Sequence, residues 1–117
     1  MWLFAGRLPD LNIGTGSGAS ANTSIADAVL DAAAASADGA GWPSRVLNGR
    51  FKGGYITRHY GAPKNGVHAV QLEMCQALYM QEKLPFAYDM PKAARIQPVL
   101  KSMMTQALAA CTKLYGA

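Results

Sequence analysis

The residue type best suited to acid–base chemistry in this sequence is a carboxylate, Glu73, at the end of the apolar run 67–74 (VHAVQLEM). If this run forms a strand, its side chains alternate, and Gln71 and Glu73 share one face. A carboxylate on an apolar strand is costly to desolvate unless a cation pairs with it. We therefore interpret Glu73 either as a salt-bridge partner of Arg50 or Arg58 or as a general base that activates water.

Positive charge is concentrated in residues 45–68, which contain five Lys or Arg, both histidines and no acidic residue. The remaining six Lys or Arg nearly balance the seven acids, so the chain as a whole is not a strongly basic nucleic-acid binder. The planar guanidinium of arginine matches a carboxylate in two hydrogen bonds. Arg50 and Arg58 are therefore suited to a small substrate that carries carboxylate or phosphate groups.

The same segment has other interpretations. A basic, solvated hairpin with no binding role would show the same charges. An RNA-binding hairpin would use Phe51, Tyr55 and Tyr60 to stack bases between the cations. The alternative to an enzyme is therefore a non-catalytic anion- or RNA-binding module built on the 45–68 hairpin.

Several other motifs are incomplete. The glycines of residues 14–19 (GTGSGA) match the letters of a dinucleotide loop, but the following helix begins too late, and no Gly-x-Ser-x-Gly elbow is present. The metal-binding types His59, His68, Glu73 and Cys75 lack the spacing of a helical zinc site. The sequence therefore predicts no metal site within this chain, and its two cysteines are interpreted as reduced core thiols.

Length and composition indicate one folded domain. The chain has 117 residues, of which 50% are hydrophobic and 15% are charged. The longest apolar stretch, residues 26–37, contains two aspartates and is too short to cross a membrane. Residues 1–7 have one basic residue after a short apolar run, unlike a signal peptide. We therefore expect a cytoplasmic protein that has no membrane segment.

The hydrophobic periodicity predicts the elements that must position these residues. Strands are expected at residues 11–13, 45–48, 54–60 and 67–74, and helices at 25–37, 75–81 and from Asp89 towards Gly116. A tight turn at residues 64–66 is expected to join two antiparallel strands. Pro98 is expected to kink the last helix or to delay its regular start.

These elements predict an α/β fold, a mixed sheet of three to four strands flanked by the first and last helices. The order of the strands stays open. An unpaired sheet edge and an apolar face would favour self-association, so a homo-oligomer is possible.

Five sequence blocks, in the same order, show a likeness to a known family. They are residues 6–15 (GRLPDLNIGT), 18–20 (GAS), 48–61 (NGRFKGGYITRHYG), 66–74 (GVHAVQLEM) and 78–80 (LYM). On these blocks nearly the whole chain resembles the C-terminal half of the N-formylglutamate amidohydrolases. That family hydrolyses N-formyl-L-glutamate to glutamate and formate in histidine degradation.

The resemblance implies a zinc carboxypeptidase-like (phosphorylase/hydrolase-like) fold, a mixed sheet flanked by helices. It also implies one zinc ion that polarises the amide carbonyl and activates water. Carried over to this sequence, it makes Glu73 the general acid/base and Arg50 and Arg58 the groups that grip the substrate carboxylates. Asn48, His59 and Gln71 would line the same pocket.

One departure from the family concerns the metal. The family's zinc ligands lie upstream of the block at residues 6–15, where this chain begins. The resemblance therefore implies that residues 1–117 form a single domain that is the C-terminal portion of a larger amidohydrolase domain. Its zinc ligands would lie outside the chain, and the isolated chain could be inactive. A lesser departure is Ala21, where family members often carry cysteine.

Overall fold

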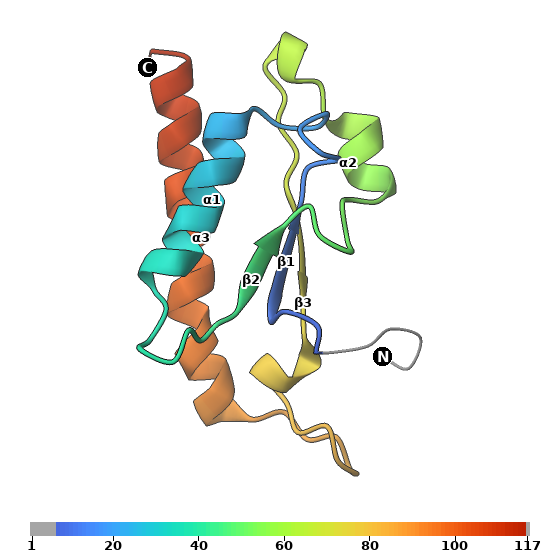
Figure 1. Cartoon of the computed structure of the whole chain (residues 1–117), viewed down its shortest axis with the longest axis vertical. Coiled ribbons are helices and arrows are strands. Elements are labelled where there is room, and N and C mark those ends of the chain that lie inside the picture. Colours follow the sequence, from blue (N-terminus) through green and yellow to red (C-terminus); the bar gives the residue numbers. More distant parts are fainter. Residues whose placement is uncertain (1–6, 117) are drawn as a thin grey trace.

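The computed structural model describes residues 7–116. Residues 1–6, on which most of the signal-peptide argument rests, lie outside the described part. The strands are β1 (Leu11–Gly14), β2 (Arg45–Leu47) and β3 (Gln71–Met74). The α-helices are α1 (Thr23–Ala35), α2 (Tyr55–Tyr60) and α3 (Met90–Leu114), and the short 3-10 turns are η1 (Pro63–Asn65) and η2 (Gln76–Leu78) (Figure 1).

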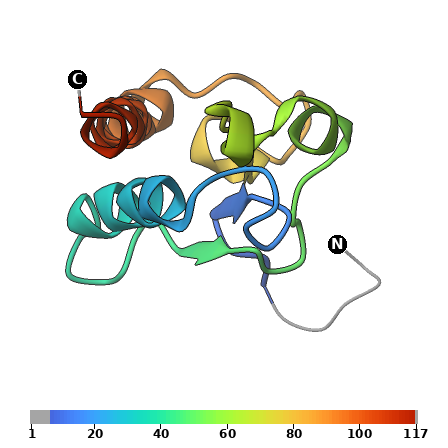
Figure 2. The same ribbon diagram turned by 90° about the horizontal axis from the view of Figure 1, so that it is seen from above.

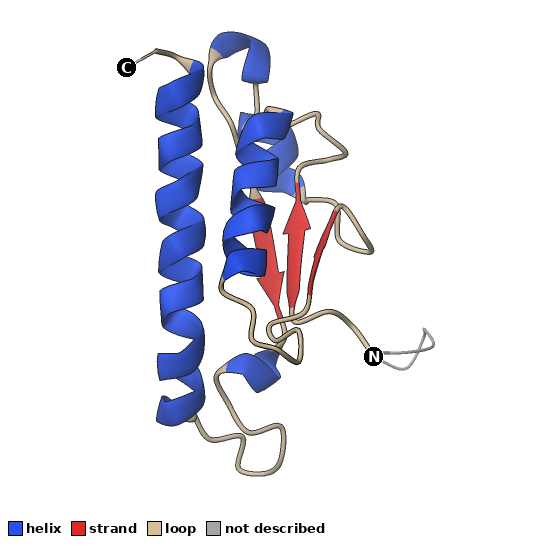
Figure 3. Ribbon diagram, turned by 60° about the vertical axis from the view of Figure 1, so that its left-hand side comes forward, coloured by secondary structure: helices blue, strands red, loops and turns tan. Residues whose placement is uncertain are grey.

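The three strands form one mixed sheet in the order β2-β1-β3 (Figure 3). The central strand β1 pairs with β2 in parallel and with β3 antiparallel. The antiparallel register sets Asn12 opposite Glu73 and Gly14 opposite Gln71. The mixed α/β fold with three strands is thus confirmed, and the order of the strands is now known.

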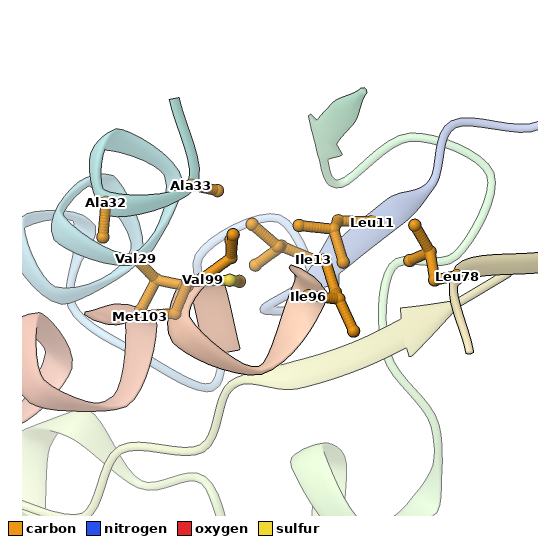
Figure 4. Close-up of a cluster of buried hydrophobic side chains, with 9 residues drawn as sticks. All are labelled: Leu11, Ile13, Val29, Ala32, Ala33, Leu78, Ile96, Val99 and Met103. Carbon is orange, nitrogen blue, oxygen red and sulfur yellow. The ribbon is translucent and has the colours of Figure 1, made fainter. Parts of the chain in front are cut away.

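Helices α1 and α3 pack against each other and cover one face of the sheet, as Figure 2 shows from above. Leu11 and Ile13 of the central strand are fully buried beneath them. The core cluster drawn in Figure 4 consists of Leu11, Ile13, Val29, Ala32, Ala33, Leu78, Ile96, Val99 and Met103. Because alternate side chains of a strand point to opposite faces, Asn12, Gly14, Gln71 and Glu73 lie on the face away from these helices.

The ends of the long helices follow the local signals in the sequence. Asn22 caps α1 by accepting a hydrogen bond from the Ser24 N–H, and Asp89 caps α3 by accepting one from the Lys92 N–H. Pro98 lies inside α3, as predicted. Gly116 follows the last helical turn with a φ of +69°, a conformation that glycine adopts without strain.

The loop between α1 and β2 is tied to α3 by one ion pair. The guanidinium of Arg95 lies 2.6 Å from the carboxylate of Asp38 and 3.7 Å from the ring centroid of Trp42. The backbone N–H groups of Trp42 and Ala40, and then Arg95, hold the pKa of Asp38 below its ordinary value. This cluster fixes the path of the chain into β2.

Two predicted elements were wrong. Residues 54–60, predicted as a strand from their β-branched and aromatic side chains, form helix α2. Residues 75–81, predicted as a helix, contain the 3-10 turn η2. A strand needs a neighbour to pair with, whereas residues 54–61 satisfy their backbone locally: Arg58 N–H donates to Gly54 O, and Gly61 N–H donates to Thr57 O.

The predicted hairpin is therefore also wrong in its first half. A turn does occur at Pro63–Asn65, and Ala62 and Val67 form an antiparallel bridge across it. The chain before this bridge is helical, and the regular strand β3 begins at Gln71. The basic segment 45–68 thus consists of the strand β2, a loop, the short helix α2 and a turn.

Two further expectations concern the cysteines and the membrane. Cys75 and Cys111 are free thiols. The Cys75 thiol donates to the carbonyl of Pro9 at 3.3 Å, and burial raises its pKa. Among residues 7–116 no helix combines the length and the apolar character that crossing a bilayer requires.

Candidate active site

The predicted catalytic residue Glu73 lines an open groove between β3 and α2, and strand alternation sets it on the sheet face away from α1 and α3. The groove is lined by backbone and side chains of both elements, among them Gly54, Tyr55, Thr57, Gln71 and Glu73. Strand alternation therefore placed Gln71 and Glu73 correctly on one face. The partner across the groove is the helix that the sequence did not predict.

Gln71 and Glu73 are joined by a hydrogen bond. The Nε2 of Gln71 donates to Oε1 of Glu73 over 2.8 Å. The other end of the same amide, Oε1 of Gln71, accepts from the backbone N–H of Gly54 over 2.7 Å. Strand β3 is thereby linked to Gly54, the residue immediately before α2.

The carboxylate of Glu73 is exposed, contrary to the expectation that it is buried on an apolar strand. Ion pairs join Arg7 to Asp10 and Arg95 to Asp38. Glu73 accepts a hydrogen bond from Gln71, and its interpretation as a salt-bridge partner stays a prediction beside that of a general base. An exposed carboxylate facing a groove remains accessible to water and to a substrate.

The predicted cationic residues lie on the segment from β2 to α2, and Arg50, Arg58 and His59 are not among the residues that line the groove. Arg50 is exposed in the loop that follows β2. Arg58 is exposed on α2, and its Nη1 donates to the carbonyl of Gly53 over 3.4 Å. His59 stacks on Tyr55 with a 5.0 Å centroid separation and meets Tyr60 edge-on. Helix α2 thus carries one cation, Arg58, together with the aromatic rings of Tyr55, His59 and Tyr60.

Asn48 occupies a different place from the other predicted pocket residues. Its Oδ1 accepts from the backbone N–H groups of Thr15 and Ser17, and its Nδ2 donates to the Thr15 hydroxyl. The side chain therefore holds the loop that follows β1. It lines a small depression on that loop, separate from the groove that contains Glu73.

Sequence reasoning missed two glycines, Gly14 and Gly53, at which the loop before α2 comes close to β1. A Cβ on Gly14 would lie 2.7 Å from the backbone carbon of Lys52 and 2.8 Å from the nitrogen of Gly53. Gly53 itself has a φ of +124°, a region that side chains rarely allow. The adjacent pair of glycines before α2 was the available signal, because such pairs mark a sharp change of chain direction.

His68 was also missed as a structural residue. Its Nδ1 accepts from the backbone N–H of Asn22, at the start of α1, and its Nε2 contacts the hydroxyl of Tyr115, after α3. Both ring nitrogens of His68 are therefore engaged by protein groups. The imidazole joins the ends of two helices to the segment before β3.

The described part of the chain contains no set of side chains that could bind a metal ion. Among residues 7–116, no three His, Cys, Asp or Glu side chains come close enough together to hold one. The zinc ion that the resemblance implies therefore does not fit these residues.

The comparisons with known proteins point to one family. A sequence model described as N-formylglutamate amidohydrolase matches residues 1–80. Two curated relatives, both named N-formylglutamate deformylase, come from Pseudomonas aeruginosa and Pseudomonas putida. They are 52% and 50% identical to this chain over 107 residues.

A solved structure supports the fold. The crystal structure of an N-formylglutamate amidohydrolase from Ralstonia eutropha JMP134 superposes with a TM-score of 0.71 over 97% of this chain, at 18% identity. This chain covers 38% of that structure's chain and 39% of each curated relative, so it spans about two fifths of their length. Because the family model matches more than half of the chain, the chain belongs to the N-formylglutamate amidohydrolase family.

Proposed function

We propose that this chain carries the catalytic carboxylate and the substrate-binding cations of an enzyme that hydrolyses N-formyl-L-glutamate to L-glutamate and formate. The observation that carries the proposal is the groove itself. An exposed carboxylate, Glu73, is held by Gln71 beside a segment that bears Arg50 and Arg58. The names of the two Pseudomonas relatives support the choice of substrate.

Glu73 would act as a general base and then as a general acid. In the first step its carboxylate accepts a proton from water as the water oxygen bonds to the formyl carbon. In the second step Glu73 returns that proton to the amide nitrogen as the carbon–nitrogen bond breaks. Formate and the free amino group of glutamate are the products, and Glu73 is again ionised.

Arg50 and Arg58 would bind the two carboxylates of the substrate. Both lie on the segment that enters and forms α2, and both are exposed. Charge-assisted hydrogen bonds from guanidinium groups select a dicarboxylate over a neutral amide. We also propose that His59, exposed on the same helix, contacts the bound substrate.

The zinc ion and the zinc carboxypeptidase-like fold also belong to this proposal. They rest on the family resemblance, and the ligands would have to come from residues other than 7–116. We infer further that the acidic substrate is a small molecule and that the cytoplasm is the site of action. The +4 formal charge of the chain suits an acidic substrate.

The test compares Glu73→Gln with the wild type in the hydrolysis of N-formyl-L-glutamate, with Zn²⁺ supplied. We expect kcat to fall by about 100- to 10,000-fold, because the variant retains the shape of Glu73 but cannot accept a proton. Binding of N-formyl-L-glutamate, measured by calorimetry, should persist. The matched control is Glu82→Gln, which changes an exposed glutamate outside the groove and should leave kcat unchanged.

Two results would contradict the proposal. Turnover that survives Glu73→Gln would remove Glu73 from the mechanism. Binding of RNA with a steep salt dependence, together with no response to N-formyl-L-glutamate, would favour the non-catalytic alternative.

A further inference from the structure

The amide of Gln71 has a single possible orientation in this structure. The backbone N–H of Gly54 lies 2.7 Å from one end of the amide, and an N–H group can only donate. That end must therefore be the oxygen, Oε1. The other end is then the NH₂ group, and it donates to Oε1 of Glu73 over 2.8 Å.

Gln71 is held at two points: its own backbone belongs to β3, and its side-chain amide accepts from the backbone N–H of Gly54. Gln71 is the first residue of β3 and pairs with Gly14 of the central strand. The loop before α2 is held beside the end of β1, because the Gly16 N–H, two residues after Gly14, donates to the carbonyl of Lys52 over 2.5 Å. Gly54 and Gln71 thus belong to one tightly connected region, whereas Glu73 is an exposed side chain with several rotatable bonds.

We propose that Gln71 is a positioning residue for Glu73. Its amide is held by the Gly54 backbone and in turn holds one carboxylate oxygen of Glu73 in place. The second oxygen of Glu73 stays available to exchange protons. The inference rests on the proposed function, in which Glu73 is the general base. Under this proposal Gln71 does not contact the substrate, because both ends of its amide are already hydrogen-bonded within the chain.

The chain offers a favourable system for testing this proposal. It contains two glutamates, Glu73 and Glu82, so labelling with [¹³C]glutamate produces two sets of side-chain signals. Glu82 is exposed in a loop region and serves as an internal reference for a freely rotating side chain. Relaxation and scalar couplings of the Cγ groups report how well each side chain is ordered, with no need for turnover.

We expect Glu73 to be ordered and Glu82 to be averaged in the wild type. In Gln71→Met, which removes both the donor and the acceptor, Glu73 should become as mobile as Glu82, and the Gly54 amide should exchange with solvent several-fold faster. Gln71→Glu keeps an acceptor for Gly54 but loses the donor. It should therefore release Glu73 while the Gly54 amide stays protected. Gln76→Met, at an exposed glutamine, is the control and should change neither signal.

Kinetics add a second readout when turnover of N-formyl-L-glutamate is measurable. A positioning role predicts that Gln71→Met lowers kcat by about 10- to 100-fold and changes KM less than about twofold, because misplacement of the base affects the chemical step. A substrate-binding role predicts the opposite, a raised KM at unchanged kcat.

Three outcomes would overturn the inference. They are an averaged Glu73 in the wild type, a Glu73 that stays ordered in Gln71→Met, and a change confined to KM. A wild type that orders Glu73 through Gln71 but never hydrolyses N-formyl-L-glutamate would contradict the proposed function instead. The two failures are therefore distinguishable.

Discussion

At the scale of single residues, the polar side chain of Asn48 stabilises the backbone of a loop through hydrogen bonds. Its φ of +53° lies in the left-handed region, which asparagine tolerates better than most residues. Its amide makes three hydrogen bonds to Thr15 and Ser17, on a loop more than thirty positions away in sequence. Its type suggested a role in the pocket, while its contacts show that it shapes the loop after β1.

Two substitutions separate the two contributions of Asn48. Asn48→Gly keeps the left-handed backbone but removes the hydrogen bonds, and we expect the free energy of unfolding to fall by about 2 kcal/mol. Asn48→Ala adds the cost of a Cβ at positive φ, roughly 1 kcal/mol more. Urea denaturation followed by circular dichroism measures both values. Equal stability of the two variants would show that the backbone conformation carries no strain.

At the scale of elements, the approach of the glycine loop to β1 organises the groove. Gly14 ends β1, and the backbone of Lys52 and Gly53 passes where a side chain of residue 14 would lie. This close approach presents Gly54 to the amide of Gln71 and starts α2 beside β3. The position of α2, and with it Arg58 and His59, therefore depends on a residue with no side chain.

Gly14→Ala tests this dependence. The added Cβ would meet backbone atoms at 2.7 to 2.9 Å, which cannot move as a flexible side chain can, so the loop must shift. We expect a loss of about 1 to 3 kcal/mol in the free energy of unfolding and faster exchange of the Gly54 amide in NMR. Gly39→Ala is the matched control, because a Cβ there meets nothing within 4 Å. A variant at position 14 as stable as the control would refute the close packing.

At the scale of the whole molecule, one apolar surface lies outside the core. A groove between α1, β3 and α3 is lined by apolar side chains, among them Leu72, Met74, Leu100, Met104 and Ala107. Met104 is 68% exposed, and Leu108, one turn further along α3, is 69% exposed. Within residues 7–116, β3 pairs on one side with β1 and its other edge is open. Open edges and apolar patches favour association.

We expect the 117-residue chain to self-associate with rising concentration in analytical ultracentrifugation. Met104→Glu should shift the distribution towards monomer without lowering the melting temperature appreciably, since the side chain is largely exposed. Leu84→Glu changes a leucine that is 83% exposed and lies outside the groove, and it should leave the distribution as in the wild type. A wild type that stays monomeric at high concentration would contradict this expectation.

Features that depend on near neighbours along the chain can be read from the amino-acid sequence. The caps Asn22 and Asp89, the long helix α3 and the alternation that sets Gln71 beside Glu73 follow from local hydrogen bonds and from the period of each element. These signals are readable because cap, helix and strand periods each involve only a few consecutive residues. Family blocks in the same order predicted the family that the comparisons then confirmed.

Other features depend on contacts between segments that lie far apart in the sequence. Residues 54–60 have strand-forming side chains but become α2; Gly53, just before them, has a left-handed φ, and within residues 7–116 no strand pairs with them. Glu73 is exposed on β3, which lies at one end of the strand order of the described sheet. The link from Gly54 to Gln71 spans seventeen positions, and no local pattern encodes it. Such contacts depend on how distant segments pack, and that packing determines which residues of the groove can act together.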